Sequence, residues 1–178
     1  MRYYKDLHIL LEAAQGTGYP IVIVGAGPLE QELRQQALAL GLDYAHFVGR
    51  LGEEDKVALL QLCTAILFPS HLRSEAFGIS LLEGAMYGKP MISSEIGTGT
   101  SYINIDIETG LVVPPSDPLA FREAMRALWE NPDRAKAMGI CALQRYEQLF
   151  TAERMGQEMA KLYREVLQQH RFQAKSGQ

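Results

Sequence analysis

Short apolar runs alternate along this chain with segments whose apolar residues recur every three or four positions. The runs are continuously apolar, which is typical of strands buried on both faces of a sheet. Strands separated by helices form βαβ units with parallel neighbours. The pattern therefore predicts an α/β fold with a Rossmann-like, doubly wound parallel sheet. The predicted strands are Ile21–Val24, Ala45–Val48, Ala65–Phe68, Pro90–Ser93 and Leu111–Val113, and the predicted helices among them are Lys5–Gln15, Leu29–Leu40, Glu53–Leu62 and Ile79–Tyr87.

Only helical patterns follow the last strand. Asp117-Pro118 and Asn131-Pro132 each pair an N-cap residue with proline at the first helical position, and Thr151 caps a long terminal helix. We expect residues 1–169 to form one domain and residues 170–178 to form a polar, frayed tail.

The start of the chain departs from the usual plan of such a sheet. A doubly wound sheet normally begins with its central strand, whereas here a helical pattern starts almost at Met1. We therefore expect the first strand to be truncated, with Met1–Tyr4 supplying at most a stub. That would leave a gap, or a partner chain's strand, beside Ile21–Val24.

Composition excludes several classes of function. The 178 residues carry a net charge of −4, which argues against binding to the phosphate backbone of nucleic acids. The apolar runs are far shorter than a transmembrane helix, and no secretory signal follows Met1. The two cysteines and four histidines lack metal-ligand spacing, so we expect a cytoplasmic protein with no metal and no disulfide.

Candidate site residues follow the predicted strands, because ligands of open α/β sheets bind at the carboxyl ends of the strands. Gly25 and Gly27 resemble part of a phosphate-binding turn, but the third glycine of the dinucleotide fingerprint is missing, so an ordinary tight turn is the alternative. Residues 94–101 form a loop that could equally line a sugar pocket or serve as a plain connection.

Two carboxylates eight positions apart carry more information. Glu75 precedes a turn at Phe77-Gly78 that opens a helix, and Glu83 lies inside that helix. The backbone N–H groups at the start of the helix can bind an anion, and a carboxylate can accept hydrogen bonds from two sugar hydroxyls. The alternative is that Glu75 caps the helix and Glu83 is a solvated surface charge.

The segment Arg73–Pro90 resembles the E-x7-E signature of retaining, nucleotide-sugar-dependent glycosyltransferases of family 4, the glycosyl transferases group 1. Other blocks similar to that family occur in the same order from about Tyr4 to Val166. They are Tyr4-Lys5, Ile23–Pro28, Phe47–Leu51, Phe68–Ser70 and Thr109–Pro118.

This resemblance implies the C-terminal, donor-binding half of a GT-B enzyme, whose acceptor-binding half would lie outside this chain. It implies transfer of a hexose from a nucleoside diphosphate sugar to a glycan or lipid acceptor, without a further cofactor, as in polysaccharide biosynthesis. Any peripheral membrane contact would come through the other half, and the isolated chain would be inactive.

The resemblance also implies roles for individual residues. Lys5 would contact the donor diphosphate and Glu75 the transferred sugar, as the catalytic pair. The donor-binding set would comprise Phe77, Gly78, Ile79 and Ser80 for sugar and phosphate, Glu83 for the ribose, His46, Phe47 and Val48 for the base, Arg50 beside it, and Gly25 and Gly27.

Two departures from the family pattern bear on these roles. The Gly-Arg pair that usually precedes the lysine is missing, and Asp6 stands where glycine commonly follows it. Two other functions also remain open: a non-catalytic nucleotide or sugar-phosphate binding module without an acceptor domain, and a nicotinamide-dependent oxidoreductase suggested by Gly25 and Gly27. His71 is interpreted as a packed or capping histidine.

Overall fold

The computed structural model describes the backbone of residues 1–176 and the side-chain surroundings of residues 1–168. It confirms the predicted α/β fold, in which all strand pairs are parallel. In chain order the elements are η1 (Tyr3–Lys5, a 3-10 turn), α1 (Leu7–Ala14), β1 (Ile21–Val24), α2 (Glu30–Ala39), β2 (Ala45–Gly49), α3 (Glu53–Leu62), β3 (Ile66–Phe68), α4 (Ile79–Met86), β4 (Met91–Ser94), α5 (Thr100–Ile103), β5 (Gly110–Val113), α6 (Pro118–Trp129), α7 (Pro132–Leu149) and α8 (Ala152–Ser176).

The strands form two separate sheets. β1 pairs with β2, and β4 lies between β3 and β5. Among the described residues, β1 and β3 share no ladder, although a doubly wound domain would join the two groups through a central strand. The residues before α1 form the turn η1 instead of a strand.

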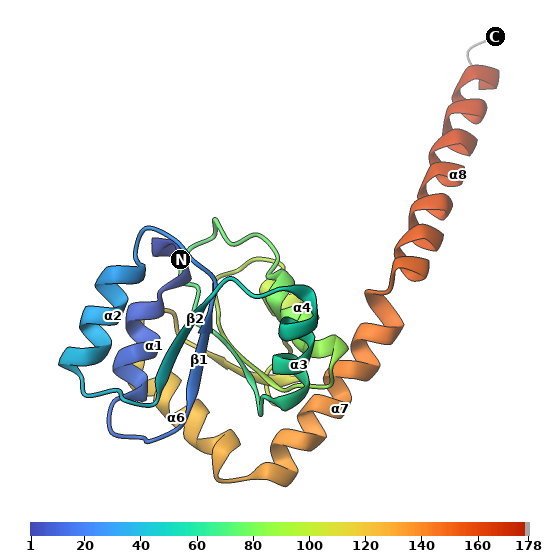
Figure 1. Ribbon diagram of the computed structural model, residues 1–178. Helices are drawn as coiled ribbons and strands as arrows, with labels where there is room; N and C mark the ends of the chain where they lie inside the picture. Colours follow the sequence, from blue (N-terminus) through green and yellow to red (C-terminus); the bar gives the residue numbers. More distant parts are fainter. Residues whose placement is uncertain (177–178) are drawn as a thin grey trace.

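Helices cover both sides of the strands (Figure 1). α1 packs against α2 and α6, and α4 packs against β3 and α7. One buried cluster joins α1 and α6 to the strands through Leu11, Ile23, Ile92 and Phe121, and a second joins α4 to α7. Helix α8 extends away from this body (Figure 1).

A buried asparagine ties the second sheet to the short helix α5. The Asn104 side chain donates to Ser93 Oγ at 2.8 Å and to the Leu111 carbonyl at 3.2 Å, and it accepts from Thr109 Oγ1 at 3.1 Å. These bonds satisfy an amide that is only 1% exposed. They also hold α5, which begins at Thr100, so the expectation of a loop over residues 94–101 is wrong for its last two residues.

Four strands differ slightly from their predicted bounds, and among them β5 begins one residue earlier, at Gly110. β2 extends to Gly49, and β3 and β4 begin one residue later than predicted, at Ile66 and Met91. The backbone of α8 is described to Ser176, so it includes most of the predicted polar tail, while residues 177–178 lie outside the described residues. Within the described part, no helix is long and apolar enough to span a bilayer.

Candidate functional site

The loops that follow β1, β3 and β5 meet the first residues of the chain at one end of the domain. Lys5, the last residue of η1, forms an ion pair with Glu75 from the loop after β3. The Lys5 ammonium also lies 4.8 Å from the centre of the Phe68 ring, and Ser70 Oγ donates to Glu75 at 3.5 Å. The structure thus brings together the two residues expected to form the catalytic pair.

The start of α4 lies directly after this loop. Gly78 adopts a left-handed conformation with φ of 91°, which glycine tolerates without the steric cost that a side chain brings. The N–H groups of Gly78, Ile79 and Ser80 have no hydrogen-bond acceptor among the described residues, as expected for the first turn of a helix. The helix start therefore offers unpaired donors to an anion, beside the Lys5 ammonium.

Glu83 lies one turn further along α4 and is also paired with a lysine. Lys56 Nζ of α3 lies 3.0 Å from Glu83 Oε1 and 3.0 Å from Glu53 Oε1. The hydrogen bonds with Glu83 and then Glu53 raise the pKa of Lys56 above its ordinary value. The Glu83 side chain is one-third exposed, so its carboxylate can accept a hydrogen bond from another donor in place of Lys56.

A cavity of about 730 Å³ connects these groups. Charged and hydroxyl side chains from four segments of the chain line it, and these are Arg2, Lys5, Lys56, Ser70, Ser80 and Glu83. Glu75 and Gly78 do not line the cavity. Glu75 is paired with Lys5, which does line it, and Gly78 lies two residues before Ser80, which lines it as well. Arg2 lines the same cavity as Lys5.

The remaining predicted donor-binding residues lie outside this cavity. His46 and Val48 of β2 and Arg50 after it are exposed, while Phe77 and Ile79 are exposed at the start of α4. The Phe47 carbonyl accepts a hydrogen bond from Arg34 at 3.1 Å, so this main-chain group is already partnered. His46, Val48 and Arg50 do not line the cavity, and of Ile79 only the N–H group belongs to the helix start described above.

Gly25 and Gly27 have distinct structural reasons to be glycine. Gly25 has φ of 111°, and its N–H donates to Gly49, which joins the ends of β1 and β2. A Cβ on Gly27 would lie 1.8 Å from the Met1 nitrogen, because the start of the chain crosses directly over it. The turn thus admits another backbone segment, and this close approach was not predicted from the sequence.

Asp6, whose orientation the sequence left undecided, points away from Lys5. Its carboxylate accepts a hydrogen bond from Ser116 Oγ at 2.9 Å and lies 3.2 Å from His71 Nδ1. Asp6 also has φ of 49°, a region in which glycine is the usual residue. The cluster of Asp6, His71 and Ser116 was missed in the sequence, because no local pattern relates residues from three distant segments.

The described residues contain no group of three or more histidine, cysteine or acidic side chains placed to hold a metal ion. Cys63 and Cys141 are both free thiols, and burial raises the pKa of Cys63.

Comparison with known proteins identifies the family. The model of the family "Glycosyl transferases group 1" matches residues 1–145. The chain is 76% identical over 152 residues to D-rhamnosyltransferase WbpZ of Pseudomonas aeruginosa, a match that covers 85% of this chain and 40% of the relative. It is 52% identical over 167 residues to O-antigen chain mannosyltransferase C of Escherichia coli, covering 94% of this chain and 45% of the relative.

The fold agrees with solved structures as well. Anabaena Alr3699/HepE in complex with UDP superimposes with a TM-score of 0.84 at 21% identity, over 92% of this chain and 46% of that one. This chain thus spans less than half the length of each of these three proteins. It belongs to the glycosyl transferases group 1 family and has the fold of one Rossmann-like domain of a GT-B glycosyltransferase, as the sequence predicted.

Proposed function

We propose that this chain is the C-terminal, donor-binding domain of a retaining glycosyltransferase, and that it binds a nucleoside diphosphate sugar at the edge formed by η1, the loop after β3 and α4. One observation supports the proposal: Lys5 is paired with Glu75, and the loop that carries Glu75 leads directly into α4, whose first N–H groups have no acceptor among the described residues.

A diphosphate fits this arrangement electrostatically. The Lys5 ammonium and the N-terminus of α4 both favour negative charge, and the N–H groups can hydrogen bond to phosphate oxygens. In group transfer from a nucleotide sugar, negative charge grows on the leaving diphosphate, and donors fixed in place stabilise it. Lys5 and the helix start would supply such donors, and we propose that the transfer needs no further cofactor.

The two glutamates would then bind hydroxyl groups. Glu75 is mostly buried and lies next to Lys5, so it would accept hydrogen bonds from the transferred sugar close to the diphosphate. Glu83 lines the same cavity further along α4 and would accept from the ribose hydroxyls. Because Lys56 already binds Glu83, the ribose must displace or share that lysine.

The relatives suggest the sugar. One is named a D-rhamnosyltransferase and the other a mannosyltransferase. D-rhamnose is 6-deoxy-D-mannose, so the two sugars share their ring configuration. We therefore propose a donor of the manno series, D-rhamnosyl in preference because of the 76% identity, and a glycan acceptor such as a growing O-antigen chain.

The acceptor would be bound by a further domain of a longer protein, since the relatives are more than twice as long as their matched parts. A single domain leaves the donor diphosphate exposed to water and lacks the groups that orient the acceptor. The isolated chain would therefore bind donors weakly and transfer no sugar. The alternative function, a non-catalytic binding module, also predicts weak donor binding and no sugar transfer for this chain. We propose a cytoplasmic location.

Titration calorimetry on four variants tests the proposal, using UDP, GDP, UDP-glucose and GDP-mannose as ligands. Lys5→Met should weaken binding of all four, because every ligand carries the diphosphate. Glu83→Gln should also weaken all four, by roughly five- to a hundredfold, through loss of the ribose contact. Glu75→Gln should weaken only the two nucleotide sugars, since the free diphosphates lack the group that Glu75 binds.

Glu53→Gln is the matched control, because Glu53 binds the same lysine as Glu83 from an exposed position outside the cavity. Circular dichroism of each variant checks that its fold is intact. If Glu75→Gln and Glu83→Gln bind every ligand as Glu53→Gln does, the two glutamates are surface charges and the proposed site is wrong.

A further inference from the structure

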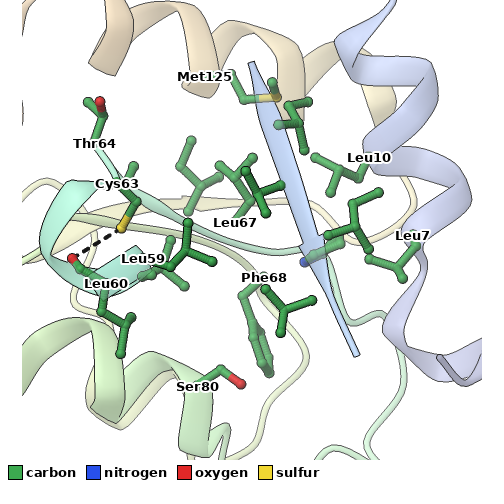
Figure 2. A pocket seen from close by; sticks show the side chains of 18 of the residues that line it. Leu7, Leu10, Leu59, Leu60, Cys63, Thr64, Leu67, Phe68, Ser80 and Met125 are labelled. Atoms are coloured by element: carbon green, nitrogen blue, oxygen red, sulfur yellow. Dashed lines mark hydrogen bonds between the residues drawn. The ribbon is translucent and has the colours of Figure 1, made fainter. Parts of the chain in front are cut away.

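Lys5 belongs to an element that is too short to fix the lysine by itself. The turn η1 has three residues, and Lys5 is the last of them. The cavity that Lys5 lines has apolar walls that include Leu7, Phe68 and Cys63 (Figure 2). Such side chains offer an ammonium no strong hydrogen-bond acceptor. The position of Lys5 therefore depends on its pairing with Glu75 and on the contacts that hold the backbone of η1.

The chain on both sides of Lys5 is joined to the loop that carries Glu75. The backbone N–H of His71 donates to the Tyr4 carbonyl at 3.1 Å. The imidazole Nδ1 of His71 is buried and lies 3.2 Å from Asp6 Oδ2, and among the described residues it has no other polar partner. The ion pair between Lys5 and Glu75 is thus flanked by two contacts of His71, one with the residue before the lysine and one with the residue after it.

The Asp6 carboxylate makes contacts with distant segments although a local partner is available. Asp6 directly precedes α1, where an aspartate usually accepts hydrogen bonds from the N–H groups of the first helical turn. Here its side chain makes no such bond. It accepts from Ser116 Oγ at 2.9 Å and faces His71, and only 8% of Asp6 is exposed. The buried carboxylate therefore joins η1 to the loop after β3 and to the loop after β5.

Both residues of the hydrogen bond between Asp6 and Ser116 have a strained backbone. Their φ angles are 49° and 55°, in the left-handed region. Among the described residues other than glycine, only one more has a positive φ, so this one bond joins two of three such residues. Strain of this kind persists only where the surrounding contacts over-determine the conformation, and it gathers at functional sites. The turn between η1 and α1 is therefore held firmly from the loop after β5.

The charge of Asp6 is a disadvantage next to a phosphate site. The residue follows Lys5 directly, and a carboxylate there repels an anion that the lysine attracts. Glycine at this position would bring neither the charge nor the strain. The contacts that Asp6 makes with His71 and Ser116 are what the aspartate contributes in return.

We propose that Asp6, His71 and Ser116 are positioning residues for Lys5: their contacts fix the turn between η1 and α1 and so hold the Lys5 ammonium beside Glu75. In the donor complex the same contacts would keep Lys5 at the diphosphate while Glu75 exchanges the lysine for sugar hydroxyls. That second part rests on the proposed function, whereas the holding of Lys5 does not.

The first test measures how strongly Lys5 and Glu75 are coupled, and it needs no nucleotide. Urea unfolding of Lys5→Met, Glu75→Gln and the double variant gives the coupling as the part of the unfolding equilibrium constant that the single changes do not explain. The same cycle is then measured in an Asp6→Gly background. Asp6→Gly also removes the strain at position 6, so the fold itself should be retained.

We expect a coupling of about threefold in the unaltered chain and almost none in the Asp6→Gly background. A Ser116→Gly background, which removes the hydroxyl and the strain at position 116, should also reduce the coupling. Equal coupling in all three backgrounds would overturn the proposal. So would the absence of coupling in the unaltered chain, because the pair would then not be held together in solution.

The second test uses calorimetry with GDP and separates the geometry of Asp6 from its charge. Asp6→Asn removes the charge but keeps an oxygen that can accept from Ser116, whereas Asp6→Gly removes both. Asp6→Gly should weaken GDP binding about fivefold, and Asp6→Asn should bind GDP at least as tightly as the unaltered chain. If Asp6 acted through its charge alone, both variants would bind GDP more tightly, and that result would overturn the proposal.

A positioning residue acts through the group that it positions. In a Lys5→Met background, Asp6→Gly should therefore not weaken GDP binding any further, and a full additional loss would mean that Asp6 acts independently of the lysine. If the unaltered chain binds no GDP at all, the proposed donor site is wrong, and the coupling between Lys5 and Glu75 alone decides whether the cluster holds the lysine.

His71 offers a matched pair of variants. In His71→Asn the side-chain amide nitrogen takes nearly the place of Nδ1 and can donate to Asp6, whereas His71→Ala removes the donor. His71→Asn should keep most of the coupling between Lys5 and Glu75 as well as GDP binding, and His71→Ala should reduce both. If the two variants lose stability equally and leave the coupling unchanged, His71 is only a packed side chain and has no positioning role.

Discussion

The two sheets of this domain differ in how completely they are buried. All four residues of β4 are buried, in the middle of the second sheet, whereas β1 alternates between buried and exposed residues, with Val22 40% and Val24 43% exposed. A parallel strand is normally covered on both faces. Strand β4 is therefore covered on both faces, whereas the side chains of β1 are buried on one face only, where Ile23 shares a cluster with Ile92. The polar site adjoins the break between the two sheets.

The largest expected difference between the sheets is in the effect of core truncation. Ile92→Ala removes a fully buried side chain of β4 and should lower the free energy of unfolding by about 2 to 5 kcal/mol. Val24→Ala on β1 should cost less than about 1 kcal/mol, because the side chain is already partly in water. Urea unfolding of both variants measures the two values, and equal losses would mean that the sheets do not differ in burial.

Two glycines give a matched comparison of close packing. A Cβ at Gly110 would lie 2.0 Å from the Met91 carbonyl oxygen of the adjoining strand, so Gly110→Ala should cost about 1 to 3 kcal/mol or more. The atoms nearest to a Cβ at Gly27 would belong to the backbone of Met1, and both residues lie in loops outside the two sheets, so we expect a smaller loss for Gly27→Ala. Thermal unfolding ranks the pair, and a larger loss for Gly27→Ala would contradict the comparison.

An exposed arginine supports the first sheet from outside. Arg34 lies 4.8 Å from the centre of the Phe47 ring and donates to the Phe47 carbonyl. Arg34→Ala should therefore destabilise the domain by about 0.5 to 1 kcal/mol, the range of an exposed cation–π contact. The control is Arg126→Ala, an exposed arginine whose partner Glu123 lies on the same helix. Chemical denaturation that finds no difference would show that Arg34 adds nothing to the first sheet.

The smallest expected effect concerns the thiol between the sheets. Burial raises the pKa of Cys63, so near pH 8 it should carry less thiolate than a free cysteine and react more slowly with iodoacetamide. Raising the pH should increase its rate beyond the pH at which free cysteine levels off. A Cys141→Ser background isolates the signal. A profile that matches free cysteine would mean that the cavity admits water freely around Cys63.

Much of the fold could be predicted from the sequence, because continuous β-branched runs such as Ile21–Val24 and caps such as Asp117 act locally. The Asp117 carboxylate accepts from the N–H groups of Leu119 and Ala120, as a helix start requires. Helix α5 could not be predicted. Its four residues are too few to show the apolar periodicity of a helix, and the helix depends on the buried hydrogen bonds of Asn104 with a neighbouring strand.

The candidate site, like the fold, has parts that could be predicted from the sequence and parts that could not. The spacing of Glu75 and Glu83 about a Phe-Gly turn indicated two carboxylates at a helix start, and the structure places them there. Their lysine partners could not be predicted equally well: Lys5 was expected from the family pattern, but Lys56 comes from a different helix and has no motif. The roles of all these residues in binding a donor remain predictions.

The hydrogen bond between Asp6 and Ser116 has a consequence for variation among relatives. At φ of 49° an aspartate is strained where glycine is not, and this bond together with the nearby His71 offsets the strain. Loss of the hydroxyl at position 116 would remove that compensation and favour glycine at position 6. Homologous sequences should therefore change at these two positions together, and a relative that keeps the acid without a donor opposite it should be the exception.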